Sequence, residues 1–158
     1  MVEAIYETLH RENQVIVCAQ SNTAVDCISE KLVDRGINVL RIGNPTRIND
    51  KMLSFTYERR FESHPDYPEL WSIRKAIRDI QSNMRKKSRE ERDTIRNRLS
   101  RLKFRATELE VKIDTELFDE ARVVACTLVG SANRVMMNRH FTTLFICLLY
   151  TSPSPRDA

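Results

Sequence analysis

The stretch that decides the fold is VIVCAQSNTAVD, residues Val15–Asp26. Its first five residues are apolar and stop abruptly at the polar cluster 20–23, and a helical spacing of apolar residues then continues to Val33. A short apolar run, a polar turn and an amphipathic helix are typical of a buried parallel strand that leads into its crossover helix. Because ligands of open α/β sheets bind at the carboxyl ends of the strands, Ser21 and Asn22 become candidate binding residues.

Three further apolar runs repeat the strand pattern, at Asn38–Ile42, Arg122–Thr127 and Thr142–Ile146. Ser21 or Asn22 is a good N-cap for the helix that follows the first strand, and Gly36 is placed to end that helix. A further helix is expected over Val2–Glu12, ahead of the first strand. Consecutive strand–helix steps predict an α/β fold with a parallel, helix-covered sheet.

The segment from Glu69 to Val129 contains neither glycine nor proline, and its apolar residues step by three and four. Two runs share this coiled-coil spacing: Ile73, Ile77, Ile80 and Met84, and then Ile95, Leu99, Leu102, Ala106, Leu109 and Ile113. One helix over Leu70–Glu120 would be about 75 Å long. We favour a hairpin that folds back near Lys86–Glu91, because each apolar seam then buries the other.

Composition excludes several classes of protein. The chain has 158 residues, enough for one domain with a core, and no apolar run approaches the ~20 residues that span a membrane. We therefore expect no membrane partner and a cytoplasmic, intracellular location. The four cysteines show no CxxC spacing, which favours reduced structural thiols, and the three histidines are too dispersed to predict a metal site.

Charge is segregated along the chain, although the net charge is only +4. Residues 74–105 hold thirteen Lys/Arg against four acids, whereas 106–120 hold six acids against one lysine. Such a distribution is typical of a nucleic-acid contact, for which Arg96, Arg98 and Arg101 are candidates. Two other interpretations stay open: a solvated coiled-coil face, and pairing between the two arms of the hairpin.

The motifs resemble those of superfamily 1 helicases of the Upf type, which include the immunoglobulin mu-binding-protein helicase. VIVCAQSNTAVD resembles motif Ia, with Gln20 in place of the usual proline, and VLRIGNPTRI resembles the strand that follows it. VVACTLVGSA resembles the strand and turn before motif II, and TTLFI resembles the start of the motif II strand. The resemblance covers about Val2–Ile146.

The resemblance implies a partial RecA-like P-loop NTPase domain that works with ATP and Mg²⁺ in the full-length parent and moves along single-stranded DNA or RNA. Its implied segments are 1–43 and 122–146 for the RecA-like sheet and 44–121 for a helical insertion that lies against nucleic acid. The residues 147–158 themselves, which include Ser-Pro-Ser-Pro and show no core pattern, predict a disordered, non-native tail. Gln20, Ser21, Asn22 and Thr127 would contact phosphates. The residues alone also allow a plain helix cap at 21–22 and a strand-end hydroxyl at Thr127.

Besides Gln20, the chain departs from the family at two further places. It contains only three glycines and no G-x-x-x-x-G-K-[ST] sequence, and Cys147-Leu148-Leu149 stands where the family has Asp-Glu. Without those groups nothing would cradle the phosphates or hold Mg²⁺. We therefore expect an inactive fragment that lies between motif I and motif II of a helicase and has no catalytic residues of its own.

A second hypothesis is a non-enzymatic basic coiled-coil module that binds nucleic acid or an acidic partner. A dehydrogenase-like nucleotide fold is disfavoured, because no G-x-G-x-x-G follows any strand. Asp26 and Glu30, four residues apart on a helix, are expected to face solvent. The choice between DNA and RNA, the direction of movement and the oligomeric state stay open.

Overall fold

The computed structural model describes residues 1–132, 136, 141 and 143–147. These residues form two compact units. The first combines Met1–Arg60 with the residues from Leu117 onward and is called the sheet unit below. The second, Phe61–Glu116, is called the helix-pair unit.

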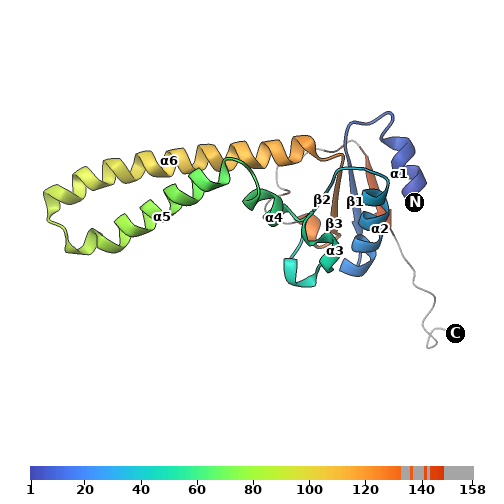
Figure 1. The fold of residues 1–158 in the computed structure, drawn as a ribbon, viewed down its shortest axis with the longest axis horizontal. Helices are drawn as coiled ribbons and strands as arrows, with labels where there is room; N and C mark the ends of the chain where they lie inside the picture. Colours follow the sequence, from blue (N-terminus) through green and yellow to red (C-terminus); the bar gives the residue numbers. More distant parts are fainter. Residues whose placement is uncertain (133–135, 137–140, 142, 148–158) are drawn as a thin grey trace. The chain divides into compact units, whose positions relative to one another are not determined.

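The sheet unit is built on a parallel sheet, which has four strands in the described part of the chain (Figure 1). The strands are β1 (Val15–Ala19), β2 (Val39–Arg41), β3 (Val123–Thr127) and β4 (Leu144–Cys147). Their order is β2-β3-β1-β4, and every pairing is parallel. The predicted α/β fold with a parallel sheet is confirmed, and each strand overlaps the run that predicted it.

Alternate side chains of the strands fill two apolar cores, one on each face of the sheet. On one face, Val15 and Val17 of β1 pack with α1 (Val2–Thr8) and α2 (Asn22–Asp34). On the other face, Ile16 and Cys18 pack with residues that include Phe118, near the end of α6 (Arg89–Glu120). Because both faces are covered, all five residues of β1 are buried, which explains its continuous apolar sequence.

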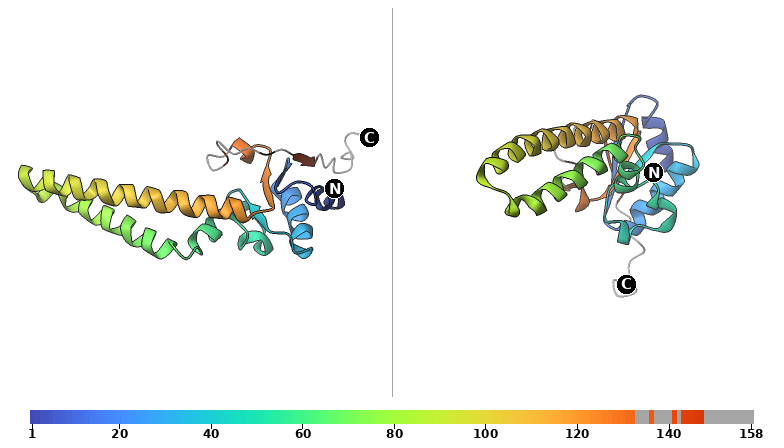
Figure 2. Two further views of the ribbon diagram at one scale, coloured as in Figure 1. Left: turned by 90° about the horizontal axis from the view of Figure 1, so that it is seen from above. Right: turned by 60° about the vertical axis from the view of Figure 1, so that its left-hand side comes forward.

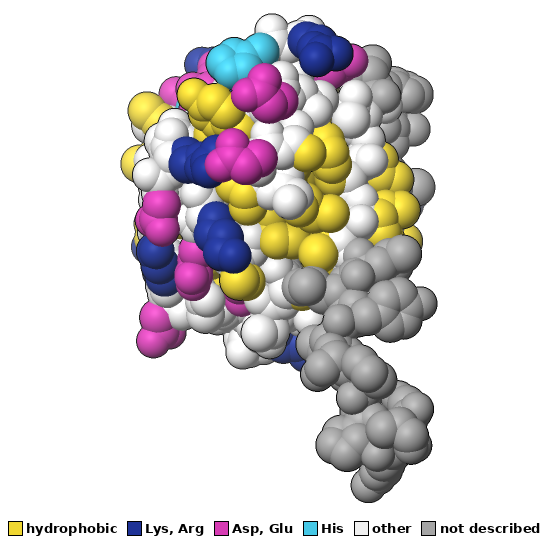
Figure 3. All heavy atoms as spheres, turned by 90° about the vertical axis from the view of Figure 1, so that its right-hand side faces the viewer, with side chains coloured by type: hydrophobic (Ala, Val, Ile, Leu, Met, Phe, Trp, Pro, Cys, Tyr) yellow, Lys and Arg dark blue, Asp and Glu magenta, His cyan; other side chains and the backbone are white. Residues whose placement is uncertain are grey.

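The strand β4 differs from β1, because among the described strands it is an edge strand with a neighbour on one side only. Its Leu144 and Ile146 are about half exposed, whereas Cys147 is buried. Apolar side chains gather on the face of the sheet unit that Figure 3 shows. The apolar sequence of β4 is therefore only partly covered by the described residues.

Both ends of α2 are closed by identifiable caps. Ser21 is the N-cap, and its Oγ accepts a hydrogen bond of 3.1 Å from the backbone N–H of Ala24. At the other end, Gly36 adopts φ +78° and donates its N–H to Val33, while Ile37 donates to Leu32. This pair of bonds is a Schellman motif, which needs a left-handed residue at the position of Gly36. Ser21 and Gly36 thus cap the helix at the positions that the sequence predicted.

The connection after β2 contains three short helices: η1 (Pro45–Arg47), α3 (Asp50–Leu53) and α4 (Tyr57–Glu62). Asn44 caps η1 and Asn49 caps α3, each through its side-chain oxygen. Met52 of α3 is buried in the same core as α1 and α2. This connection therefore packs on the sheet unit.

The helix-pair unit consists of α5 (Tyr67–Asn83), η2 (Met84–Lys86) and most of α6 (Figure 2). A turn at 84–88 separates the helices, so the structure has two helices where a single long helix was the alternative. Four residues of the second predicted run are buried, namely Leu99, Ala106, Leu109 and Ile113, and so is Leu70, which the predicted seam did not include. The other seam residues are only half-buried, among them the whole first run, Ile73, Ile77, Ile80 and Met84.

The compact units do not follow the predicted segment bounds. Residues 44–60 and 117–121, which we assigned to the helical insertion, group with the sheet. Within the predicted tail 147–158, Cys147 is the last residue of β4, and residues 148–158 lie outside the described part of the chain. Among the described residues, no helix is both long enough and apolar enough to cross a membrane.

Candidate nucleic-acid interface

Two polar turns leave the sheet side by side, at the carboxyl ends of β1 and β3. Ala19 and Thr127 are partners in the parallel register, and the N–H of Leu128 donates to the carbonyl of Ala19 at 2.8 Å. The turn after β1 carries the predicted residues Gln20, Ser21 and Asn22, and Thr127 ends β3. The structure therefore brings these four predicted residues to one edge of the sheet.

The turn after β1 places polar groups at the N-terminus of α2. The side chains of Gln20 and Ser21 are exposed, and Asn22 is half-buried. Ser21 is a helix cap, as one of the open interpretations held, but a hydroxyl that accepts from Ala24 can still donate its own hydrogen. In the described part of the chain no partner accepts from the N–H groups of Asn22 and Thr23. The helix end thus offers free donors where its dipole is positive.

Thr127 is tied into its own turn. Its Oγ1 accepts a 2.9 Å hydrogen bond from the N–H of Gly130, the first residue of η3 (Gly130–Ala132). A Cβ placed on Gly130 would lie 2.8 Å from that same Oγ1, so a larger residue there would force the Thr127 side chain or the turn to move. Like Ser21, Thr127 uses its oxygen as a local acceptor and keeps a hydroxyl hydrogen to donate.

Asp26 lies behind this edge, and our expectation that it faces solvent is wrong. Its side chain is buried, and its Oδ1 accepts from Nε of the buried Arg41 at 2.9 Å. Its Oδ2 accepts from the N–H of Asn49 at 3.0 Å. The carboxylate therefore faces inward from α2 towards β2 because a buried guanidinium and a backbone N–H need it there.

Arg41 also contacts this candidate site, and the sequence did not predict it. Its Nη2 donates to Oδ1 of Asn22 at 2.9 Å, and its Nη1 donates to the carbonyl of Ile42 at 2.5 Å. Gly43 leaves room for this side chain, because a Cβ there would come within 3.1 Å of Nη1. One signal could have found it: a lone arginine inside the apolar strand VLRI requires a buried partner of opposite charge.

The predicted arginines of the insertion belong to the helix-pair unit and not to the sheet unit. All three are exposed on α6. Arg96 lies 3.6 Å from Asp93, one helical turn away, whereas Arg98 and Arg101 have no ion pair with any described residue. Arg98 also lines a pocket of about 290 Å³ near the turn, together with Ile80, Ile95 and Lys87.

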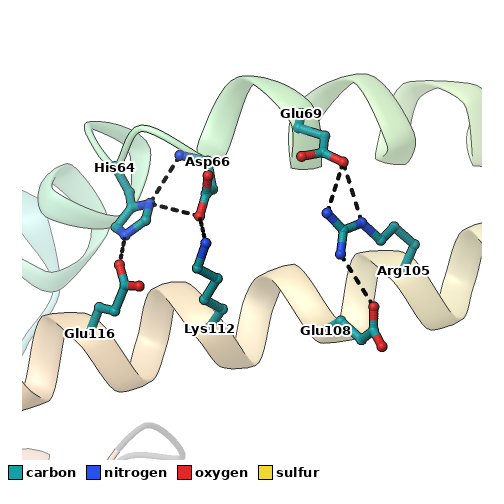
Figure 4. Close-up of polar contacts among 7 residues, drawn as sticks. All are labelled: His64, Asp66, Glu69, Arg105, Glu108, Lys112 and Glu116. Carbon is teal, nitrogen blue, oxygen red and sulfur yellow. Dashed lines mark hydrogen bonds and ion pairs between the residues drawn. The ribbon is translucent and has the colours of Figure 1, made fainter.

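Ion pairs join α6 to the start of α5 at the other end of the helix pair (Figure 4). Lys112 donates to Asp66 at 2.7 Å, and this hydrogen bond lowers the pKa of Asp66 and raises that of Lys112. Arg105 lies 3.2 Å from Glu69, and Glu116 contacts Nε2 of His64. Pairing between the arms therefore accounts for part of the charge segregation, whereas Arg98 and Arg101 have no acidic partner among the described residues.

Three of the four cysteines are buried in the core of the sheet unit. Cys18 and Cys126 are register partners on β1 and β3, with their sulfur atoms 3.5 Å apart. Their contact lowers the pKa of Cys18, while the same contact and burial raise the pKa of Cys126. Cys147 is also buried, and Cys27 of α2 is exposed. Three of the four free thiols are therefore buried, as expected of structural cysteines, whereas Cys27 is not.

Comparison with known proteins identifies the family. The AAA domain family matches residues 1–146. The chain is 27% identical over 147 residues to DNA polymerase alpha-associated DNA helicase A of Schizosaccharomyces pombe, covering 92% of this chain and 22% of that protein. It is 23% identical to the DNA-binding protein SMUBP-2 of Mesocricetus auratus, with 92% and 15% covered.

A third relative is a Regulator of nonsense transcripts 1 homolog of Arabidopsis thaliana, 27% identical over 139 residues, with 85% of this chain and 10% of that protein covered. The chain thus spans less than a quarter of the length of each of these relatives. The family match spans the segments that carry the motifs at β1, β2 and β3 and the start of β4. The chain therefore belongs to the AAA domain family and, within it, to the superfamily 1 helicases of the Upf type.

Proposed function

We propose that this chain is part of an ATP-dependent helicase and supplies contacts to the single-stranded DNA or RNA along which the full-length protein moves. The main support is that the turns after β1 and β3 lie side by side at the carboxyl ends of these strands and carry exposed polar groups. Free N–H groups at a helix N-terminus and short polar side chains suit phosphate oxygens and read no base sequence. A motor that moves along any sequence needs contacts of this kind.

Each predicted residue at this edge has a donor to offer. Ser21 and Thr127 keep a hydroxyl hydrogen, and Asn22 keeps its side-chain Nδ2, because its Oδ1 is bound to Arg41. Gln20 adds an exposed amide. These groups would hold successive phosphates of one strand by neutral hydrogen bonds, which a motor can release at each step.

The helix pair would be an insertion that adds a cationic contact. Near its turn, Arg98 and Arg101 are exposed and no described acid pairs with them, and Arg96 is held only by a neighbour on its own helix. Exposed guanidinium groups bind backbone phosphates in a salt-dependent way. We assign these three arginines to contacts with the same nucleic acid that the sheet edge binds.

ATP and Mg²⁺ would serve the full-length parent, in an intracellular protein, but the residues of this chain do not fit them. Each glycine meets a local steric or conformational need, since Gly36 ends α2, Gly43 clears Arg41 and Gly130 clears Thr127. None of them belongs to a phosphate-cradling G-x-x-x-x-G-K-[ST] loop, and buried Cys147 follows Ile146 where the family has a carboxylate. We therefore expect no nucleic-acid-stimulated ATP hydrolysis by the purified 158 residues.

Fluorescence anisotropy with labelled oligothymidylate and oligouridylate tests the contact. We expect Ser21→Ala and Asn22→Ala each to weaken binding about fivefold, the effect of one lost hydrogen bond. Replacing Arg96, Arg98 and Arg101 by glutamine should make the negative slope of log K against log salt shallower by about 2. The matched control replaces three exposed arginines of the sheet unit, Arg11, Arg47 and Arg59.

A second function, a non-enzymatic basic module, is favoured by the uncompensated charge near the turn of the helix pair. It predicts that the glutamine substitutions on α6 abolish binding, whereas Ser21→Ala and Asn22→Ala have no effect. If the control substitutions weaken binding as much as those on α6, the contact is a general charge effect, and both assignments of a defined nucleic-acid surface fail.

A further inference from the structure

We infer that Arg41 is a positioning residue for the nucleic-acid contact: it fixes the side-chain amide of Asn22 so that its NH₂ group faces the phosphate. This inference rests on the proposed function, because it presumes that Asn22 contacts the nucleic acid. It adds a role for a residue that contacts no nucleic acid itself.

The chemistry of the pair decides which way the amide points. A guanidinium carries five N–H donors and no acceptor, so it can bind Asn22 only through the carbonyl oxygen of the amide. The 2.9 Å contact between Nη2 and Oδ1 has this polarity. The reversed amide would place its NH₂ against another donor, and the bond would be lost. Nδ2 is therefore the group that Asn22 keeps for a ligand, and it can only donate.

Arg41 cannot easily turn away from Asn22. Its side chain is inaccessible to solvent, with Nε on Asp26, Nη1 on the Ile42 carbonyl and Nη1 close above Gly43. These contacts come from α2 and from the turn that follows β2, so two segments fix one guanidinium. Because the guanidinium is buried and its charge is balanced by Asp26, Arg41 would affect the bound nucleic acid only through Asn22.

A double-mutant cycle separates positioning from mere stability. The substitutions are Asn22→Ala, Arg41→Lys and both together, with affinity for oligothymidylate measured by anisotropy and folding checked by thermal denaturation. Lysine keeps a positive charge for Asp26 but cannot also supply the fork that reaches Asn22. We expect Arg41→Lys to weaken binding about fivefold in the wild-type background and not to weaken it further in the Asn22→Ala background.

Two further variants keep the test decisive. Asn22→Asp preserves the acceptor for Arg41 and replaces the outward donor by a carboxylate oxygen, so binding should fall at least as far as with Asn22→Ala. Ile28→Val, in the buried face of α2, lowers stability without touching the network and should leave affinity unchanged. If Arg41→Lys does not fold, Asn22→Asp alone still tests the polarity of the amide.

The outcomes distinguish the inference from the function on which it rests. If Asn22→Ala binds as tightly as the wild type, or if the wild type binds no strand, the proposed contact fails and the inference fails with it. If Asn22→Ala weakens binding but Arg41→Lys does not, or does so equally in both backgrounds, Arg41 has only a structural role. Undiminished binding by Asn22→Asp overturns the inference in the same way.

Discussion

Arg41 and Asp26 form a buried ion pair, with Nε 2.9 Å from Oδ1 and both side chains almost inaccessible to solvent. The pair joins β2 to α2, and the second oxygen of Asp26 adds the N–H of Asn49 ahead of α3. One carboxylate thus ties three consecutive segments together directly behind the turn that carries Ser21 and Asn22.

Removing Asp26 should destabilise the sheet unit strongly. In Asp26→Ala the guanidinium of Arg41 stays buried without its counter-charge, a change that costs about 3–5 kcal/mol. We expect this loss in the free energy of unfolding, measured by urea denaturation followed by circular dichroism.

Asp34→Ala is the matched control for this prediction. Asp34 lies on the same helix and pairs with Lys51 at 3.2 Å, but both side chains are more than half exposed. Such a surface pair contributes about 0.2–1 kcal/mol. Similar losses for Asp26→Ala and Asp34→Ala would contradict the assignment of a buried ion pair to Asp26.

The sequence predicted the strands and α2 well, because their signals are local. An apolar run bounded by polar residues predicts β1, and the serine cap and Gly36 predict the ends of α2. The burial of Asp26 was not predicted, because its signal is not local. Its partner Arg41 lies fifteen residues away, and helical periodicity cannot show which polar residue of α2 contacts that arginine.

The charge pattern shows a similar limit in the helix pair. Segregated charge allowed a phosphate contact, pairing between the arms or a solvated face, and only the register between α5 and α6 decides among these at each position. That register pairs Lys112 with Asp66 and Arg105 with Glu69, while it leaves Arg98 and Arg101 without an acidic partner among the described residues.

The Asp66–Lys112 pair should make the stability of the helix pair depend on pH. The pKa of Asp66 is lowered in the folded chain by the hydrogen bond from Lys112. The stabilisation is therefore complete above the unfolded-state pKa of about 3.9 and is lost as the pH falls through the lower folded-state value. We expect Lys112→Ala to lower the thermal midpoint at neutral pH and to match the wild type in strong acid.

Lys103→Ala serves as the control, because Lys103 is exposed on the same helix and pairs with no described acid. Its midpoint should follow that of the wild type at every pH. High salt should also shrink the effect of Lys112→Ala, since the pair is accessible to water. A difference between Lys112→Ala and wild type that persists unchanged in strong acid would point to lost packing instead of the ion pair.

The thiols should react in two classes. Cys27 is exposed on α2, whereas Cys18, Cys126 and Cys147 are buried in the sheet. Because thiol reagents attack the accessible thiolate, one equivalent should react quickly in the native chain and the remainder only on unfolding. Cys27→Ser should abolish the fast phase and leave the slow phase intact. A second fast thiol in the native chain would show that β1, β3 or β4 opens readily.

Gly130 and Thr127 should be coupled in stability. A Cβ at Gly130 would lie 2.8 Å from the Thr127 hydroxyl, well inside contact distance, so Gly130→Ala forces the turn after β3 to move. We expect a loss of about 1–3 kcal/mol in urea denaturation, the usual cost of overpacking. In the Thr127→Ala background the clash is gone, because the next atoms lie 3.8 Å away or more, and the same substitution should cost clearly less. Equal costs in both backgrounds would mean that Gly130 is required for its backbone conformation and not for the space that Thr127 occupies.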